Sequence, residues 1–203
     1  MRISTILLIV CSLCSPAIKA QWQMQSIPIQ TRWAKEVNPS NALPEYPRPQ
    51  MVRENNWQNL NGLWKYTITA KDASQPANYD GAILVPYPIE SALSGVKKSL
   101  LPDQLLWYST TFQNPSTPQS PKTLLHFGAV DYKATVYVNG KEVGGHEGGY
   151  TAFSFDITDA LKAGSNELVV KVYDPTTTDG MPRSFLARSK KTTGIPSFFI
   201  LTK

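Results

Sequence analysis

Acidic side chains are the first residues to consider for chemistry, because two opposed carboxyl groups can supply a general acid and a base or nucleophile. The sequence holds 15 Asp and Glu residues, and each has a simpler structural role to weigh against catalysis. Glu142 and Glu167 flank a hairpin and a strand start, where carboxylates are usually solvated. Four others stand beside turn residues and are predicted to cap local backbone: Asp156, Asp159, Asp174 and Asp179. No pair stands out, so we predict no catalytic residue in this chain.

A glycine-rich segment at residues 144–150 (GGHEGGY) is the next place to look, since its four glycines let the backbone approach a ligand closely. The segment lacks the Lys-Ser/Thr pair and the following helix of a phosphate-binding loop. The pattern predicts a tight bend between strands that carries His146 and Glu147 to the surface. Contact of these two side chains with a sugar or with another subunit is the alternative. His126 alternates with apolar neighbours and is predicted to be a partly buried strand histidine.

Aromatic rings and loop polar residues complete the set, because the apolar face of a pyranose can pack on an aromatic ring. Trp107 and Tyr108 point to opposite faces of one predicted strand, and we expect Trp107 in the core and Tyr108 exposed. The polar loop residues are of the kind that hydrogen-bond sugar hydroxyls, although ordinary solvation explains them equally well. The candidate carbohydrate-binding residues are Glu90, Ser91, Asp103, Tyr108, His146 and Glu147.

The first 20 residues are predicted to be a secretory signal peptide that is cleaved after Ala20. Arg2 gives a positive start, and the apolar run ends at Leu13, well short of the roughly 20 residues that a transmembrane anchor needs. We therefore expect an exported protein, periplasmic or secreted, without membrane contact after cleavage. Both cysteines lie inside the signal, which leaves His126 and His146 as the imidazoles of the mature chain. We predict no metal site and no cofactor.

The formal net charge of +5 is concentrated in the signal and in the last 22 residues. Residues 21–181 carry 13 Lys and Arg against 15 Asp and Glu, whereas residues 182–203 carry 5 basic residues and no acid. A slightly acidic body lacks the electrostatic footprint of a nucleic-acid-binding protein. We therefore expect no nucleic-acid partner, and the sequence makes no prediction of oligomeric state.

Short segments with period-two alternation must position the polar residues, and they predict β-strands. Asn139-Gly140 between two of these segments is the strongest hairpin signal. Many short strands with almost no helix predict an antiparallel two-sheet sandwich, with a closed barrel as the alternative. The predicted strands lie at residues 64–69, 83–85, 106–112, 122–127, 132–138, 141–143, 153–157 and 168–172.

The chain divides into four predicted parts: the signal at residues 1–20, a leader at 21–55, a domain at 56–175 and a divergent basic tail at 176–203. The leader is rich in proline, which predicts an extended segment without a long helix. Trp22, Trp33 and Tyr46 are costly to leave in water, so we expect the leader to pack on the domain. A disordered leader is the alternative.

Four stretches carry a family resemblance: residues 56–66 (NWQNLNGLWKY), 85–96 (VPYPIESALSGV), 105–112 (LLWYSTTF) and 125–174 (LHFGAVDYKATVYVNGKEVGGHEGGYTAFSFDITDALKAGSNELVVKVYD). They closely resemble the N-terminal sugar-binding domain of glycoside hydrolase family two, the β-galactosidase and β-glucuronidase family. Residues 31–53 are also similar to the opening of its exported bacterial members. The resemblance implies a jelly-roll, galactose-binding-domain-like sandwich, followed in whole enzymes by an immunoglobulin-like domain and a (β/α) barrel. That barrel holds the catalytic glutamates of the family, and no position in this chain matches them.

The resemblance ends near Arg183, because residues 184–203 (SFLARSKKTTGIPSFFILTK) do not match the family pattern. We hypothesise a frameshifted or truncated gene in which unrelated sequence replaces the closing strand, with residues 198–201 adding an edge strand. The resemblance then implies the sugar-binding region of an exported β-glycosidase, without its catalytic barrel, that does not hydrolyse glycosides alone. The partner would be a β-galactoside or a related glycan. The alternatives are a free-standing lectin-like module and an inert remnant.

Overall fold

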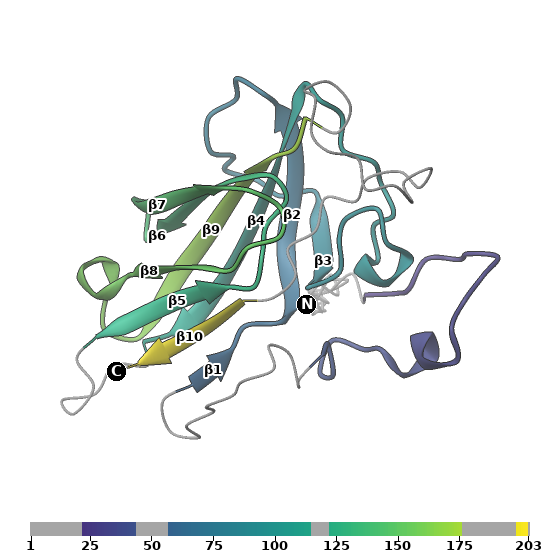
Figure 1. Ribbon diagram of the computed structural model, residues 1–203, viewed down its shortest axis with the longest axis horizontal. Helices are drawn as coiled ribbons and strands as arrows, with labels where there is room; N and C mark the ends of the chain where they lie inside the picture. Colours follow the sequence, from purple (N-terminus) through teal and green to yellow (C-terminus); the bar gives the residue numbers. More distant parts are fainter. Residues whose placement is uncertain (1–21, 44–56, 115–121, 176–197, 203) are drawn as a thin grey trace, which may run out of the picture.

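The computed structural model of the protein describes residues 22–43, 57–114, 122–175 and 198–202 (Figure 1). Within these ranges the regular structure is β-strand apart from three short 3-10 helices, none of them long and apolar enough to cross a bilayer. In chain order the elements are η1 (Arg32–Glu36), β1 (Trp57–Asn59), β2 (Gly62–Ala70), β3 (Gly81–Val85), η2 (Ala92–Ser94), β4 (Gln104–Gln113), β5 (Thr123–Phe127), β6 (Lys133–Val138), β7 (Lys141–Glu147), β8 (Phe153–Asp156), η3 (Thr158–Ala160), β9 (Ser165–Tyr173) and β10 (Phe198–Thr202).

The described strands form two antiparallel sheets, and Figure 1 shows the smaller sheet lying across one face of the larger. The larger sheet has the strand order β3-β2-β4-β9-β6-β7, and the smaller has the order β1-β10-β5-β8. The predicted antiparallel sandwich is therefore confirmed. The alternative of a closed barrel is wrong, because each sheet is open and ends in edge strands.

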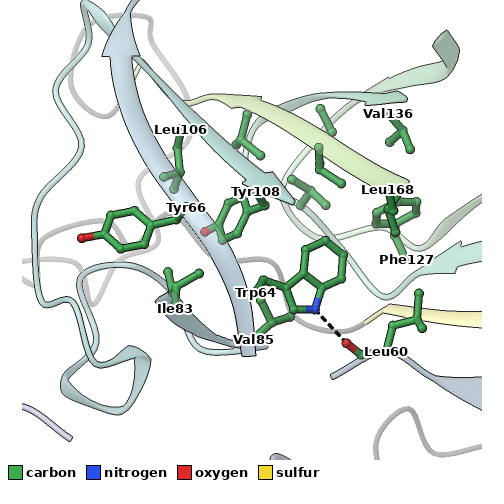
Figure 2. Close-up of a cluster of buried hydrophobic side chains, with 14 of the residues drawn as sticks. Leu60, Trp64, Tyr66, Ile83, Val85, Leu106, Tyr108, Phe127, Val136 and Leu168 are labelled. Carbon is green, nitrogen blue, oxygen red and sulfur yellow. Dashed lines mark hydrogen bonds between the residues drawn. The ribbon is translucent and has the colours of Figure 1, made fainter. Parts of the chain in front are cut away.

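Alternating apolar residues of the two sheets point toward each other and form the main core (Figure 2). Trp64 and Leu168 of the larger sheet meet Phe127 of the smaller sheet in this cluster. The indole Nε1 of Trp64 donates a 2.8 Å hydrogen bond to the carbonyl of Leu60, so the ring is buried with its polar atom paired. Full burial of a side chain such as Leu168 contributes about 1.5–3 kcal/mol. The alternation predicted from the sequence is thus the alternation that builds the core.

The β6–β7 hairpin turns at Asn139 and Gly140, as predicted, with φ values of 52° and 79°. Positive φ at both positions is what a tight two-residue turn needs, and Asn-Gly supplies it at little steric cost. The Asn139 amide also donates a 2.8 Å hydrogen bond to the carbonyl of Ala160, while its Oδ1 accepts a 3.1 Å bond from the backbone of Glu167. The turn therefore anchors the hairpin to two neighbouring segments.

Strand β7 is longer than the sequence predicts and runs through Glu147. Pairing with β6 continues after a register shift, with Gly144 opposite Val136 and Glu147 opposite Lys133. The prediction of a tight bend over all of residues 144–150 is therefore wrong for its first four residues. Gly144 allows close packing between the sheets, because a Cβ added to it would lie 2.3 Å from the Phe155 ring.

The described part of the leader packs on the segment around η2, as expected from Trp22. The Trp22 indole donates a 3.2 Å hydrogen bond to the Leu93 carbonyl, and the Gln25 amide donates a 2.8 Å bond to the Gly95 carbonyl. The ammonium of Lys97 closes the contact with a 2.6 Å bond to the Ser26 carbonyl. We call this contact between residues 22–26 and 92–97 the leader clamp.

Trp33 behaves differently from Trp22, since its side chain is 56% exposed. The guanidinium of Arg32 lies 4.4 Å from its ring centre, which covers the ring locally. The expectation that Trp33 docks on the domain is therefore wrong, and Tyr46 lies outside the described residues.

Residues 198–202 form β10, which confirms a strand in the tail but corrects its position. It lies between β1 and β5 and is antiparallel to both, so it is an inner strand of the smaller sheet. The physical reason is that β1 and β5 do not pair with each other, and each offers β10 a free backbone edge.

Candidate functional site

The six candidate residues do not gather in one place. Glu90 and Ser91 lie between β3 and η2, Asp103 directly precedes β4, and His146 and Glu147 end β7. Asp103 and Glu147 lie at the same end of the larger sheet, because β9 and β6 connect these strand ends in register. Strands β4 and β7 are three strand spacings apart, which is about 14 Å. A single small ligand therefore does not contact all six residues.

Ser91 is used by the local backbone. Its hydroxyl accepts a 3.2 Å hydrogen bond from the amide of Leu93 and caps the start of η2. Its carbonyl accepts a 2.7 Å bond from the Ser94 hydroxyl, and Ser94 is fully buried. Ser91 therefore shapes the segment to which the leader docks, and this local role accounts for a serine here.

Tyr108 corrects one prediction, because its side chain is fully buried and not exposed. The expected burial of Trp107 is confirmed at 2% exposure. Both faces of β4 are covered: Tyr108 lies in the core between the sheets, while Tyr137 and Tyr173 pack against Trp107 on the outer face. Alternation could not separate the two rings, because neither face of β4 is in water.

The phenol of Tyr108 is held in its neutral form. Burial raises the pKa of Tyr108 above its ordinary value by disfavouring the phenolate, and the negative charge of Glu90 raises it further. Its hydroxyl has no hydrogen-bond partner within the described part of the chain. Tyr108 is thus a core residue, and a saccharide at the surface does not reach it.

His146 belongs to an aromatic stack between the edges of the two sheets. Its ring lies 4.1 Å from the Phe153 ring at an interplanar angle of 10°, and Phe153 stacks on Phe127 at 4.6 Å and 10°. The Nε2 atom of His146 shares a 3.2 Å hydrogen bond with the hydroxyl of Thr151. The Nδ1 atom is buried and makes no hydrogen bond to any described residue. His146 therefore fixes the loop that follows β7 more than it presents a base to solvent.

The loop after β7 folds tightly over the start of β6. The amide of Gly148 donates a 2.9 Å hydrogen bond to the Tyr132 carbonyl. A Cβ added to Gly149 would lie 2.7 Å from the carboxylate of Asp131, so only glycine allows this approach. At the tip of the same loop, the Tyr150 side chain is 88% exposed. The loop is thus packed at its base and presents an aromatic ring at its tip.

Glu147 lies beside this loop and forms an ion pair with Lys133, its cross-strand neighbour, at 2.6 Å. The hydrogen bond and the negative charge of Glu147 raise the pKa of Lys133. Both side chains are more than half exposed, so the pair is weak and open to a competing ligand. We call the group formed by Glu147, Tyr150 and Thr151 the β7 end.

The β7 end combines groups of the kind that contact polar ligands. It presents an exposed ring, a carboxylate acceptor and a hydroxyl that both donates and accepts. Among the described residues, no group of three or more His, Cys, Asp or Glu is placed to hold a metal ion. Sequence reasoning missed Tyr150 and Thr151, although an aromatic residue directly after a glycine pair is a signal that could have identified the tip.

His126 is partly buried in strand β5, as predicted. Its Nδ1 atom shares a hydrogen bond with the hydroxyl of Ser154 on β8, which is opposite in register. Asp156 also has its predicted role, because it accepts a 3.0 Å bond from the backbone of Thr158 at the start of η3. These two residues join β5, β8 and η3 and lie outside the β7 end.

Comparison with known proteins places this architecture. Residues 96–184 match the family model described as the glycosyl hydrolase 2 galactose-binding domain-like. A β-galactosidase of Thermoanaerobacter pseudethanolicus is 44% identical over 66 residues, which cover 32% of this chain and 9% of that protein. A β-glucuronidase of Paenibacillus borealis is 26% identical over 133 residues, which cover 63% of this chain and 22% of that protein. The matched region thus spans less than a quarter of either relative.

Solved structures agree with the sequence relatives. The β-glucuronidase of Lactobacillus rhamnosus superposes with a TM-score of 0.58 and 28% identity, over 74% of this chain and 29% of that chain. The β-glucuronidase of Ruminococcus gnavus shares the fold with a TM-score of 0.56 and 23% identity, over 75% of this chain and 29% of that chain. The family model, the relatives and the sandwich of two antiparallel sheets lead to the same assignment. Residues 96–184 therefore match the galactose-binding-like domain of the glycosyl hydrolase 2 family, within a sandwich fold that the chain shares with these β-glucuronidases.

Proposed function

We propose that this chain is the sugar-binding N-terminal region of an exported β-glycosidase, an enzyme that as a whole hydrolyses O-glycosyl bonds in carbohydrate metabolism. The observation that supports it most directly is the β7 end, where the 88% exposed Tyr150 ring lies next to Thr151. The apolar face of a pyranose packs on such a ring. The Glu147 carboxylate then accepts hydrogen bonds from the hydroxyl groups of the sugar, and the Thr151 hydroxyl can donate or accept them.

The sugar class follows from the relatives and belongs to the proposal. The relatives carry the names β-galactosidase and β-glucuronidase, so we propose a β-galactoside or a β-glucuronide as the ligand. The chain spans less than a third of these proteins, and the activity of a whole enzyme is part of the proposal alone.

We further propose that the described residues do not cleave glycosides themselves. Hydrolysis needs a protonated carboxyl group as general acid, usually with a raised pKa, opposite a second carboxylate at about 5–9.5 Å. Hydrogen bonds from Thr158 lower the pKa of Asp156, which is the reverse of this requirement. Glu147 forms an ion pair with Lys133. These carboxylates serve folding and binding in the proposal.

Export through the signal peptide at residues 1–20 is also a proposal, and it rests on the sequence pattern alone. Mass spectrometry of the chain secreted by a bacterial host tests it. We expect a mature N-terminus at Gln21, and a chain that retains Met1 in the cytoplasm would contradict the proposal.

Calorimetric titration of the purified chain with methyl β-D-galactoside and methyl β-D-glucuronide tests sugar binding. We expect binding of at least one of them with a Kd in the millimolar to micromolar range, about −4 to −8 kcal/mol. The absence of heat with both sugars would contradict the sugar-binding proposal.

A release assay with 4-nitrophenyl β-D-galactoside and 4-nitrophenyl β-D-glucuronide tests the second half of the proposal. We expect no release above the rate in buffer. Turnover by the purified chain would show that its own carboxyl groups perform the chemistry and would overturn this part.

A further inference from the structure

The outer face of the larger sheet carries lysine and tyrosine side chains in cross-strand register. On β9, Lys171 lies opposite Trp107 of β4 on one side and opposite Thr135 of β6 on the other. Two residues further along β9, Tyr173 lies opposite Lys133 of β6. Side chains two residues apart share a face, so Lys171 and Tyr173 point to the same side, away from the core. We call Lys71, Lys171, Tyr137 and Tyr173 the lysine–tyrosine face.

The cations of this face are positioned by the rings. The ammonium of Lys71 donates a 2.8 Å hydrogen bond to the hydroxyl of Tyr173 and lies 4.0 Å from the centre of the same ring. The ammonium of Lys171 lies 5.8 Å from the Trp107 ring and 5.9 Å from the Tyr137 ring. Attraction to the ring faces holds these flexible side chains over the sheet. The aromatic layer thus orders two cations that are otherwise mobile.

Neither of these two cations forms an ion pair with an acid of the described residues, although Glu142 lies opposite Tyr137 in register. Within the described ranges, the ion pairs join Lys122 to Asp156 and Lys133 to Glu147, and neither involves Lys71 or Lys171. Tyr137 and Tyr173 are only partly buried, so each leaves part of its surface accessible. Trp107 itself is 2% exposed and serves as the floor under Lys171.

We propose that the lysine–tyrosine face binds an acidic oligosaccharide, one that carries carboxylate groups on its pyranose rings. The two ammonium groups match the carboxylates, and the partly exposed tyrosine rings match the apolar faces of the sugars. A neutral sugar would leave the charges unmatched, and a deeply stacked ligand is excluded because Trp107 is covered. This inference rests on the proposed carbohydrate-binding function and adds a second, charge-selective surface on the same sheet, with Tyr137 one strand from β7 and with Lys171 and Tyr173 two strands from it.

Titration of the full chain at low salt with tetragalacturonate, and with a neutral galactose tetramer of the same length, tests the inference. The acidic tetramer should bind more tightly, and rising salt should remove the difference. The double variant Lys71→Gln with Lys171→Gln should weaken binding of the acidic tetramer about tenfold, the effect of losing hydrogen bonds to charged groups. Lys162→Gln, at an exposed lysine between η3 and β9, is the matched control and should leave the affinity unchanged.

Three outcomes would overturn the inference. The acidic tetramer does not bind, the double variant and the control bind it equally, or a single-stranded oligonucleotide of equal charge binds at the same lysines with equal affinity. The last outcome would identify a general polyanion surface. If methyl β-D-galactoside or methyl β-D-glucuronide still binds in any of these cases, the proposed function stands and only the second surface fails. Circular dichroism of the double variant verifies that the sheet is intact.

Discussion

The leader clamp and the β7 end both rely on a glycine that lets another group come close, yet they differ in what remains available to a ligand. At the leader clamp, the Gly95 carbonyl accepts from Gln25 and the Ser91 hydroxyl caps η2, so these polar groups serve the backbone. In the loop that carries the β7 end, Gly149 packs on Asp131 while Tyr150 remains 88% exposed. Polar, glycine-containing sequence therefore marks close packing in both regions, and only the second leaves groups in solvent for binding.

The largest expected effect tests whether the β7 end depends on its aromatic stack. Phe127 is 1% exposed and stacks on the Phe153 ring, which also stacks on the His146 ring. Phe127→Ala leaves a cavity under the stack and should lower the free energy of unfolding by about 3–5 kcal/mol. Urea denaturation followed by tryptophan fluorescence measures the change.

Phe127→Leu is the matched variant, because it keeps most of the apolar volume while removing the ring. It should cost less than Phe127→Ala, about 1–1.5 kcal/mol. A loss below about 1 kcal/mol for Phe127→Ala would contradict the importance of the stack, since the β7 end would then be held by hydrogen bonds alone.

The next effect tests the leader clamp. Gly95 has a φ of 83°, and a Cβ there would lie 2.7 Å from the Trp22 ring. Gly95→Ala combines backbone strain with a collision, and should lower the free energy of unfolding by about 2–3 kcal/mol. The displaced leader should also become sensitive to trypsin at Arg32 and Lys35, which limited proteolysis measures.

Gly140→Ala supplies the control for backbone strain without collision. Gly140 has a φ of 79°, and nothing lies within 4 Å of its added Cβ. It should cost about 1 kcal/mol and leave cleavage of the leader unchanged. Equal sensitivity of the two variants to trypsin would contradict a specific contact between Gly95 and Trp22.

The sequence allowed most of the fold to be predicted where one face of a strand is apolar and the pattern is local. Trp64 and Tyr66 in β2, and the turn at Asn139 and Gly140, are of this kind. The prediction of an exposed Tyr108 was wrong because both faces of its strand are covered, so apolar and polar positions do not alternate there. The prediction of an edge position for β10 was wrong because a local sequence pattern does not determine which distant strands pair.

The candidate site was predictable only in part, for a related reason. Glu147 is at the surface as expected, but the role of His146 depends on Phe153, which lies on a strand of the other sheet. Ser91 has the residue type of a ligand-binding serine, but its hydroxyl already accepts a hydrogen bond from the Leu93 amide. A polar residue type does not reveal whether the backbone already uses it, and this decides which polar groups can bind a ligand.

A smaller effect separates binding from stability at the β7 end. Tyr150→Ala should change the free energy of unfolding by less than about 0.5 kcal/mol, because the ring is in solvent. It should weaken sugar binding about fivefold to tenfold through loss of the stacking surface, as measured by calorimetry. Ile29→Ala, at a leader residue that is 86% exposed, is the control and should change neither quantity. Unchanged sugar affinity in Tyr150→Ala would place the binding site elsewhere.

The smallest effect is expected at Asp156, which caps η3 outside both the leader clamp and the β7 end. It shows how much an exposed carboxylate contributes to stability. Hydrogen bonds from the side chain and backbone of Thr158, with a smaller contribution from Lys122, lower the pKa of Asp156 below its ordinary 3.8. A lowered folded-state pKa stabilises the fold above the unfolded-state pKa, and this contribution is lost as the pH falls through the folded-state value. Because the group is screened by solvent, Asp156→Asn should cost only a few tenths of a kcal/mol near pH 7, and the difference from wild type should shrink near pH 2. Urea denaturation at both pH values measures it, and a difference that stays constant with pH would mean that the cap acts through its shape and not through its charge.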